Sequence, residues 1–308
     1  MKLMMEDNRT EIVESVKRKF FRKFLKEISL DELNFLLQLP VCIKDILLER
    51  FQQSEDKEIV EEYFRKHSFL SKVLMKNPAT FKMLELIYTG ENIRGLIDRY
   101  SFNTPSAQAL RNRLLSVTSI ARRIIKAKAN KKIEMKVFNL GSGPGRDTIE
   151  ILEGNSYLTD FVSMDCIDID SEALEKGKEL MKKKNLIGIT FTQGDIVRLK
   201  RRDEIDLGLI IGVLCGLEHK TCVAVLKRIK RSFKKGGIII ASNVLKSMPG
   251  EDPFMSYLLK DIIGWKLVYK GIEEIRQIFL EAGYEWEGIL YDEPTRFHGL
   301  GIGKVPFT

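Results

Sequence analysis

The stretch Asn139-Leu140-Gly141-Ser142-Gly143-Pro144-Gly145-Arg146-Asp147 decides the fold. Its glycines follow a short apolar run at 137–140 and precede an amphipathic segment. The stretch therefore predicts a tight turn between a buried strand and a helix. Glycines in such a turn let the backbone come close to a ligand. The dinucleotide fingerprint spaces its glycines as GxGxxG, but here the third glycine arrives one residue early and Arg146 stands in its place. The loop also lacks the Lys-Ser/Thr pair of a Walker phosphate loop, so neither of those two ligand sites is expected.

From Met135 onward, short apolar runs alternate with amphipathic helices. Repeated strand–helix units predict a parallel sheet with right-handed crossovers, and the last two strands, joined by a short link, predict an antiparallel hairpin at one edge. The expected fold class is therefore α/β, a doubly wound seven-stranded Rossmann-like sheet whose last strand is antiparallel. The expected strands are 137–140, 161–169, 190–193, 207–211, 238–242, 285–291 and 298–304, and the main helices are 171–184, 220–233 and 272–282.

Residues 1 to about 130 have a different, entirely helical pattern, in which apolar residues recur at spacings of three and four. A loop at 101–105 precedes a long helix at about 106–128. We therefore expect two domains: an all-helical N-terminal domain, residues 1–104, that covers the substrate site as a lid, and an α/β domain, residues 105–308, that binds the cofactor.

Composition excludes several classes of protein. The chain has 308 residues with a net charge of +8, and no apolar run is long enough for a transmembrane span. No secretory signal is expected at the N-terminus. Four cysteines without CxxC spacing and three separated histidines predict no disulfide framework, no metal site and a cytoplasmic location. The cysteines are Cys42, Cys166, Cys215 and Cys222.

Two acids follow the second and third expected strands. Asp168 ends the strand after the glycine turn, where a carboxylate can bind both hydroxyls of a ribose. The alternative is a capping role at the next helix, which we assign to Asp170 or Ser171. Asp195, beside Ile196, ends the third strand, where an acid can hold an adenine amine while the apolar neighbour flanks the ring.

The glycine turn, Asp168 and Asp195, in this order and ahead of the final strand pair, resemble class I S-adenosylmethionine-dependent methyltransferases over about residues 105–308. The resemblance implies S-adenosylmethionine as cofactor, with the glycine turn near its methionine part and Asp168 near its ribose. It also implies that the end of the fourth strand lines the methyl-transfer centre. The signature of amino-directed nucleic-acid enzymes is absent there, and Cys215 is interpreted as a core thiol. The predicted cofactor-binding residues are Gly141, Ser142, Gly143, Gly145, Asp168, Ile169, Asp195, Ile196, Ile211 and Gly212.

A narrower resemblance extends over residues 78–88, 105–113, 257–259 and 264–269. These segments are similar to a bacterial group of methyltransferases that includes enzymes making methyl esters of 3-hydroxy fatty acids. Those enzymes carry a helical segment ahead of the catalytic domain, with a similar Arg-x-Arg at Arg111 and Arg113.

Substrate-side and catalytic residues are predicted from topology. Ligands of open α/β sheets lie at the carboxyl ends of the parallel strands, which places His219, Arg296 and His298 on the functional edge as catalytic candidates. The competing interpretations are a helix N-terminal residue for His219 and a strand-start residue for His298. Candidate substrate contacts are Tyr88, Tyr100, Arg111, Arg113, Trp265 and Tyr269. The alternative role for the two arginines is an ion pair inside the lid. The alternative role for Trp265 and Tyr269 is packing in the core.

The expected function is methyl transfer from S-adenosylmethionine to a small anionic molecule, most simply on the oxygen of a carboxylate, which needs no catalytic base. Two alternatives stay open. One is an RNA methyltransferase that uses the nine cations between Arg111 and Lys136. The other is a noncatalytic protein that binds the cofactor and acts through a partner.

Overall fold

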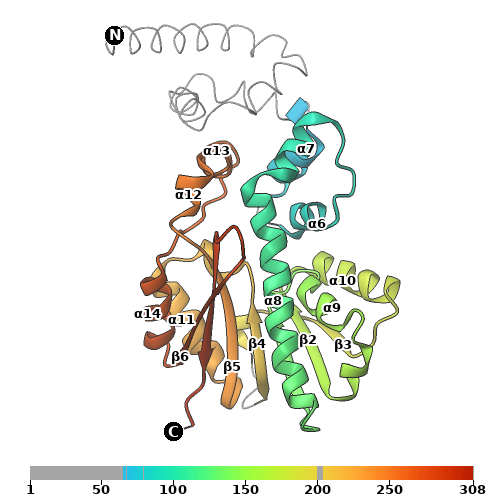
Figure 1. Ribbon diagram of the computed structural model, residues 1–308, viewed down its shortest axis with the longest axis vertical. Helices are drawn as coiled ribbons and strands as arrows, with labels where there is room; N and C mark the ends of the chain where they lie inside the picture. Colours follow the sequence, from blue (N-terminus) through green and yellow to red (C-terminus); the bar gives the residue numbers. More distant parts are fainter. Residues whose placement is uncertain (1–64, 67, 79, 200–203, 308) are drawn as a thin grey trace, which may run out of the picture.

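The computed structural model describes residues 65–66, 68–78, 80–199 and 204–307 (Figure 1). Seven strands form one sheet in the order β3-β2-β1-β4-β5-β7-β6. The helical pattern predicted for residues 1–64 lies outside the described residues. The strands are β1 (Met135–Leu140), β2 (Val162–Asp168), β3 (Ile189–Gln193), β4 (Ile205–Ile210), β5 (Phe233–Val244), β6 (Glu285–Tyr291) and β7 (His298–Lys304).

The pairing of the strands confirms the predicted fold class. The first five strands are parallel to one another, and β7 runs antiparallel between β5 and β6. Strands β1 and β4 are buried along almost their whole length, as expected for parallel strands covered on both faces. Strand β5 is longer than the expected 238–242, because its first residue, Phe233, already pairs with Ile205. The intervening Lys-Lys-Gly-Gly segment hides this extension from a hydropathy pattern.

Helices cover both faces of the sheet (Figure 1). One apolar cluster joins the sheet to α8 and α9, and another joins it to α11 and α14 on the other face. The long helix α8 begins at Pro105 because the Thr104 hydroxyl accepts a hydrogen bond from the Ala107 amide, an N-terminal cap. The helices are α8 (Pro105–Ala129), α9 (Arg146–Leu152), α10 (Ser171–Lys183), α11 (His219–Lys230) and α14 (Ile272–Glu281).

A third apolar cluster lies beyond the carboxyl ends of the strands and combines helices that precede β1 with helices that follow β5. The carboxylate of Asp252 ties the two groups together, because it accepts hydrogen bonds from the backbone amide and the hydroxyl of Ser106. The members of the second group are too short to be predicted by periodicity. The helices are α5 (Phe69–Lys76), α6 (Phe81–Thr89) and α7 (Gly95–Asn103), and then α12 (Met248–Glu251), α13 (Pro253–Tyr257) and the π-helix η4 (Leu258–Ile262).

Two features are absent from the described residues. No helix among them is both long and apolar enough to cross a bilayer. They also contain no group of three or more His, Cys, Asp or Glu side chains placed to hold a metal ion.

Candidate active site

Two neighbouring cavities lie at the carboxyl ends of the parallel strands. The first, here called the strand-end cleft, has a volume of about 470 Å³ and lies between the loops after β1 to β4 and helix α6. This volume is in the range of small-molecule sites. Nine of the ten predicted cofactor residues line it, namely Gly141, Ser142, Gly143, Asp168, Ile169, Asp195, Ile196, Ile211 and Gly212.

The glycine turn forms one wall of this cleft. Gly141 has a φ of +70°, and a Cβ added to it would lie 2.5 Å from a methyl group of Val213, so a larger residue fits neither the backbone nor the space. Gly145 was predicted to approach the cofactor, but it does not line the cleft. It precedes α9, and an added Cβ would lie 2.6 Å from the Cys166 sulfur. Gly145 therefore permits the close packing of helix on strand.

The Asp168 carboxylate holds the turn in place. Its two oxygens accept hydrogen bonds from the Gly143 amide, at 2.7 Å, and from the Asp170 amide, at 2.9 Å. Asp170 caps α10 by accepting from the amides of Glu172 and Ala173, so one of the two residues predicted as the cap takes that role. Asp168, at the end of β2, does not cap α10, and it lines the cleft.

Helix α6 closes the opposite side of the cleft, which sequence reasoning missed. Glu85 of α6 forms a bidentate ion pair with Arg146 at the start of α9, with distances of 3.2 and 2.5 Å. Lys82 forms a second ion pair, 2.8 Å, with Glu172 on α10. The unusual Arg146 in the glycine motif indicates that a partner exists. The sequence does not identify this partner, because Glu85 lies 61 residues away.

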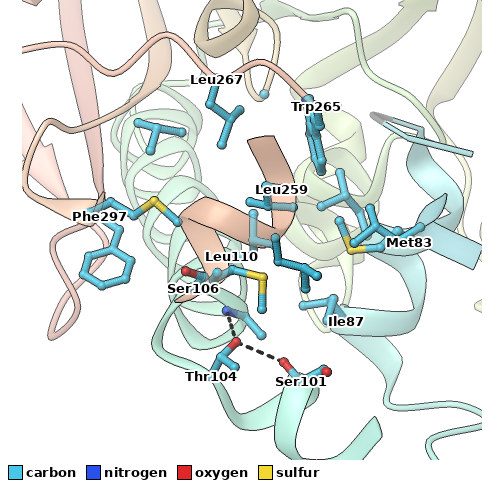
Figure 2. Close-up of a pocket in the computed structure, with 18 of the residues that line it drawn as sticks. Met83, Ile87, Ser101, Thr104, Ser106, Leu110, Leu259, Trp265, Leu267 and Phe297 are labelled. Carbon is cyan, nitrogen blue, oxygen red and sulfur yellow. Dashed lines mark hydrogen bonds between the residues drawn. The ribbon is translucent and has the colours of Figure 1, made fainter. Parts of the chain in front are cut away.

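The second cavity, here called the helical cavity, has a volume of about 110 Å³ and is enclosed by the third apolar cluster (Figure 2). Its lining combines α5 to α8 with the segment after β5, and most of the side chains are apolar. Leu84, Arg113 and Gly212 line both cavities, so the two spaces share a wall. Of the candidate substrate contacts, Trp265 lines the helical cavity and Tyr88 lines the strand-end cleft.

Arg113 is the polar centre of the shared wall. Its side chain is 4% exposed, its Nη2 donates to the Tyr88 hydroxyl at 3.1 Å, and its Nε has no hydrogen-bond partner among the described residues. A Cβ added to Gly212, at the end of β4, would lie 3.8 Å from both terminal nitrogens. Arg113 therefore places a positive charge with unused donor capacity beside the predicted methyl-transfer centre.

Burial near Arg113 changes the acidity of two neighbours. Burial raises the pKa of Asp147 to about 6, although the positive charge of Arg113 opposes the shift. Burial also raises the pKa of the Tyr88 phenol above its usual range. At neutral pH, Asp147 is consequently ionised and Tyr88 is protonated.

His298 lines the helical cavity and is oriented by Asp292. The fully buried Asp292 accepts hydrogen bonds from the His298 amide at 2.6 Å, from the Thr295 hydroxyl at 2.7 Å, and pairs with His298 Nδ1 at 3.2 Å. Burial and the nearby Arg113 lower the pKa of His298, against the influence of Asp292. Neutral His298 that donates through Nδ1 keeps the lone pair of Nε2 available.

Several predicted site residues lie elsewhere, because local partners hold their side chains. His219 pairs with Glu281 at 3.2 Å, and Arg296, 63% exposed, pairs with Glu293 at 2.8 Å. Arg111 donates to the Phe102 carbonyl and lies over the Phe102 ring. None of these three lines either cavity, nor does Tyr269, which hydrogen-bonds to Ser256. The side chain of Tyr100 lies outside the described part of the chain.

Comparisons with known proteins agree with this geometry. Residues 131–282 match a family model described as a methyltransferase domain. A possible exported protein from Bordetella parapertussis has the same fold at 16% identity, with a TM-score of 0.61, covering 77% of this chain and 86% of that chain. Magnesium protoporphyrin IX methyltransferase from Synechocystis with bound SAH is 15% identical with a TM-score of 0.53, covering 81% and 100%. No curated protein matches the chain significantly.

The matched domain, the strand order and the strand-end cleft together define the class. The chain therefore contains a methyltransferase domain with the fold of class I S-adenosylmethionine-dependent methyltransferases, as the glycine turn and the two acids predicted.

Proposed function

We propose that the protein transfers the methyl group of S-adenosylmethionine to an oxygen of a small, anionic acceptor with an apolar body, most simply a carboxylate. The proposal rests on the buried charge of Arg113 in the wall that the two cavities share. Among the described residues that line the helical cavity, it has the only permanent charge, and it also lines the strand-end cleft.

The residues of the strand-end cleft suit the cofactor. Asp168 is available to the ribose, and the exposed Ile169 together with Asp195 and Ile196 offers apolar and acidic contacts to an adenine. The cofactor supplies a methyl group already activated on a sulfonium, so the protein has to align and desolvate the two reactants. Gly212 and Arg113 stand where the two cavities meet, which is where this alignment is required.

A carboxylate acceptor fits the shared wall in a simple way. The unused Nε and the terminal nitrogens of Arg113 can hold a carboxylate in a charge-assisted hydrogen bond. The apolar lining then receives the rest of the acceptor and excludes water from the reacting atoms. No base is needed, because the nucleophile is already ionised at neutral pH.

The His298–Asp292 pair favours a second candidate, a hydroxyl acceptor. A neutral, oriented imidazole can take the proton of a hydroxyl as it is methylated, and such a base typically contributes 10²- to 10⁴-fold in rate. A carboxylate would gain nothing from this base. The two candidates therefore predict different effects of replacing His298.

The experiment incubates the protein with radiolabelled S-adenosylmethionine and a cell extract, followed by separation into RNA, protein and small molecules. We expect label in small molecules, its release by mild alkali, its loss in Arg113→Met, and a kcat within about tenfold of wild type in His298→Asn. An alkali-stable product with a more than hundredfold fall in His298→Asn would instead establish the hydroxyl acceptor.

Two other results would contradict the proposal altogether. Label in RNA would instead support the RNA methyltransferase alternative, which uses the cations between Arg111 and Lys136. Binding of S-adenosylmethionine by calorimetry without label in any fraction would show that the protein is noncatalytic.

A further inference from the structure

Four hydroxyl side chains interrupt the apolar lining of the helical cavity: Ser71, Ser101, Thr104 and Ser106. Two of them are fully engaged within the protein. The Thr104 hydroxyl donates to the Ser101 carbonyl and accepts from the Ala107 amide, as the dashed lines in Figure 2 show. The Ser106 hydroxyl donates to Asp252 at 2.6 Å.

The other two hydroxyls, those of Ser71 and Ser101, form no hydrogen bond with any described residue. Both residues are buried, with exposed fractions of 3% and 6%, and both line the cavity. A hydroxyl that lines an apolar cavity and has no partner in the protein can both donate a hydrogen bond to a bound ligand and accept one from it. Two of them in one small cavity point to a polar group of a ligand.

The Ser68–Asp98 hydrogen bond joins the two helices that carry these serines. The Ser68 hydroxyl donates to Asp98 at 2.6 Å and so joins the start of α5 to α7. Ser71 and Ser101 each follow one of these residues by three positions, which is the same face of each helix one turn later.

These two serines lie away from the methyl-transfer centre. Ser106, Leu110 and Arg113 follow one another along the cavity side of α8, and the rise of the helix separates Ser106 from Arg113 by about 10 Å. Ser101 precedes α8 and lies beside Thr104 at its start (Figure 2). The cavity thus has a charged end at Arg113 and a hydroxyl-lined end at α5 and α7, with apolar walls between.

We infer that the acceptor carries a second, uncharged polar group, such as a hydroxyl or a carbonyl, at the end remote from the methylated oxygen, and that Ser71 and Ser101 bind it. The inference rests on the proposed function, because it assumes that the acceptor occupies the helical cavity with its anionic end at Arg113. Ser71 and Ser101 then determine specificity, since their hydroxyls stay unpaired when a purely apolar acceptor is bound.

Calorimetric binding to the full-length protein, saturated with S-adenosylhomocysteine, tests this inference. The probes are hexanoate, octanoate and decanoate, each compared with the corresponding acid that carries a hydroxyl on its last carbon. We expect at least one hydroxylated acid to bind about tenfold more tightly than its parent. We expect that preference to disappear in the double variant Ser71→Ala/Ser101→Ala and to persist in Ser256→Ala, whose hydroxyl pairs with Tyr269 outside the cavity lining.

The outcomes separate the two proposals. If the parent acids bind and Arg113→Met weakens them, but no hydroxylated acid is preferred, the inference fails while the proposed function stands. A preference that survives the double serine variant also overturns the inference. If no acid binds, or if Arg113→Met leaves every affinity unchanged, the proposed function fails and the inference fails with it. Thermal unfolding of the double variant in the absence of ligand verifies that it is folded.

Discussion

Arg113 Nη2 donates a hydrogen bond to the Tyr88 hydroxyl across the wall that separates the two cavities. Arg113 is buried and Tyr88 is partly buried, and Asp147 lies near enough for its charge to influence both. The contact joins helix α6 to helix α8 at the point where cofactor and acceptor are proposed to meet.

Replacing Arg113 with Met should raise the KM for the acceptor by about 10- to 100-fold, because a hydrogen bond to a charged group contributes about 1.5–3 kcal/mol. The affinity for S-adenosylhomocysteine, measured by calorimetry, should change by less than about threefold. Arg111→Met is the matched control, since the Arg111 guanidinium packs on Phe102 outside both cavities. Equal effects of the two substitutions would contradict the assignment of Arg113.

Replacing Asp168 with Ala should weaken binding of S-adenosylmethionine by roughly tenfold to a thousandfold. The substitution removes the proposed ribose contact and also the acceptor that holds the Gly143 amide. Asp170→Ala is the comparison, because it removes a helix cap and should cost about 1 kcal/mol of stability with little change in affinity. A folded Asp168→Ala protein with wild-type affinity would refute the ribose assignment.

Asp147 should make cofactor binding depend on pH. Its pKa of about 6 means that the carboxylate lining the strand-end cleft is charged at pH 7.5 and largely protonated at pH 5. S-Adenosylmethionine carries a positive sulfonium, so its affinity should fall as the pH drops through about 6, and Asp147→Asn should remove this dependence. Calorimetry from pH 5 to 7.5 measures it, with the uncharged sulfur of S-adenosylhomocysteine as the comparison. An equal pH dependence in Asp147→Asn would assign the titration to another group.

The same pKa has a consequence for stability. Asp147 has a higher pKa in the folded protein than in the unfolded chain, so its ionisation opposes folding as the pH rises from about 4 to about 6. Asp147→Asn should therefore increase the free energy of unfolding more at pH 7 than at pH 5. Urea denaturation at the two pH values provides this measurement.

Replacing Gly145 with Ala should destabilise the fold by about 2–4 kcal/mol, because the residue has a φ of +67° and its new methyl group would press on the Cys166 sulfur. Cofactor affinity, measured on the fraction that remains folded, should be near wild type. Adding Cys166→Ala should recover part of the lost stability by making room for the methyl group. A large loss of affinity without a loss of stability would restore Gly145 to the cofactor site.

The local parts of the site could be predicted from the sequence, and the parts assembled over long distances could not. The glycine turn and Asp168 lie at the ends of adjacent strands, so their order along the chain already places them together. The topology also places Arg296 and His298 at the correct edge. It cannot show that Arg296 pairs with Glu293 while His298 lines a cavity, because side-chain partners decide this difference.

The helical cavity illustrates the same limit. Its walls combine residues near 70–113 with residues near 244–298, and the Ser106–Asp252 hydrogen bond that joins them spans 146 positions. Apolar residues in short helices give no periodic signal strong enough to reveal such a contact. The sequence predicts Arg113 as a substrate contact. Its position in the wall between the two cavities depends on the packing of α6, α8 and β4, which the sequence does not show.

Helix α6 has one further consequence, which concerns the order of events in a catalytic cycle. It lines both cavities, and the ion pairs of Glu85 and Lys82 fasten it to the helices that follow the glycine turn and β2. Any movement of α6 that widens one cavity also disturbs the other. With the acceptor in the helical cavity, as proposed, release of the demethylated cofactor and departure of the methylated product should be coupled, and the turnover rate should depend on the strength of these two ion pairs.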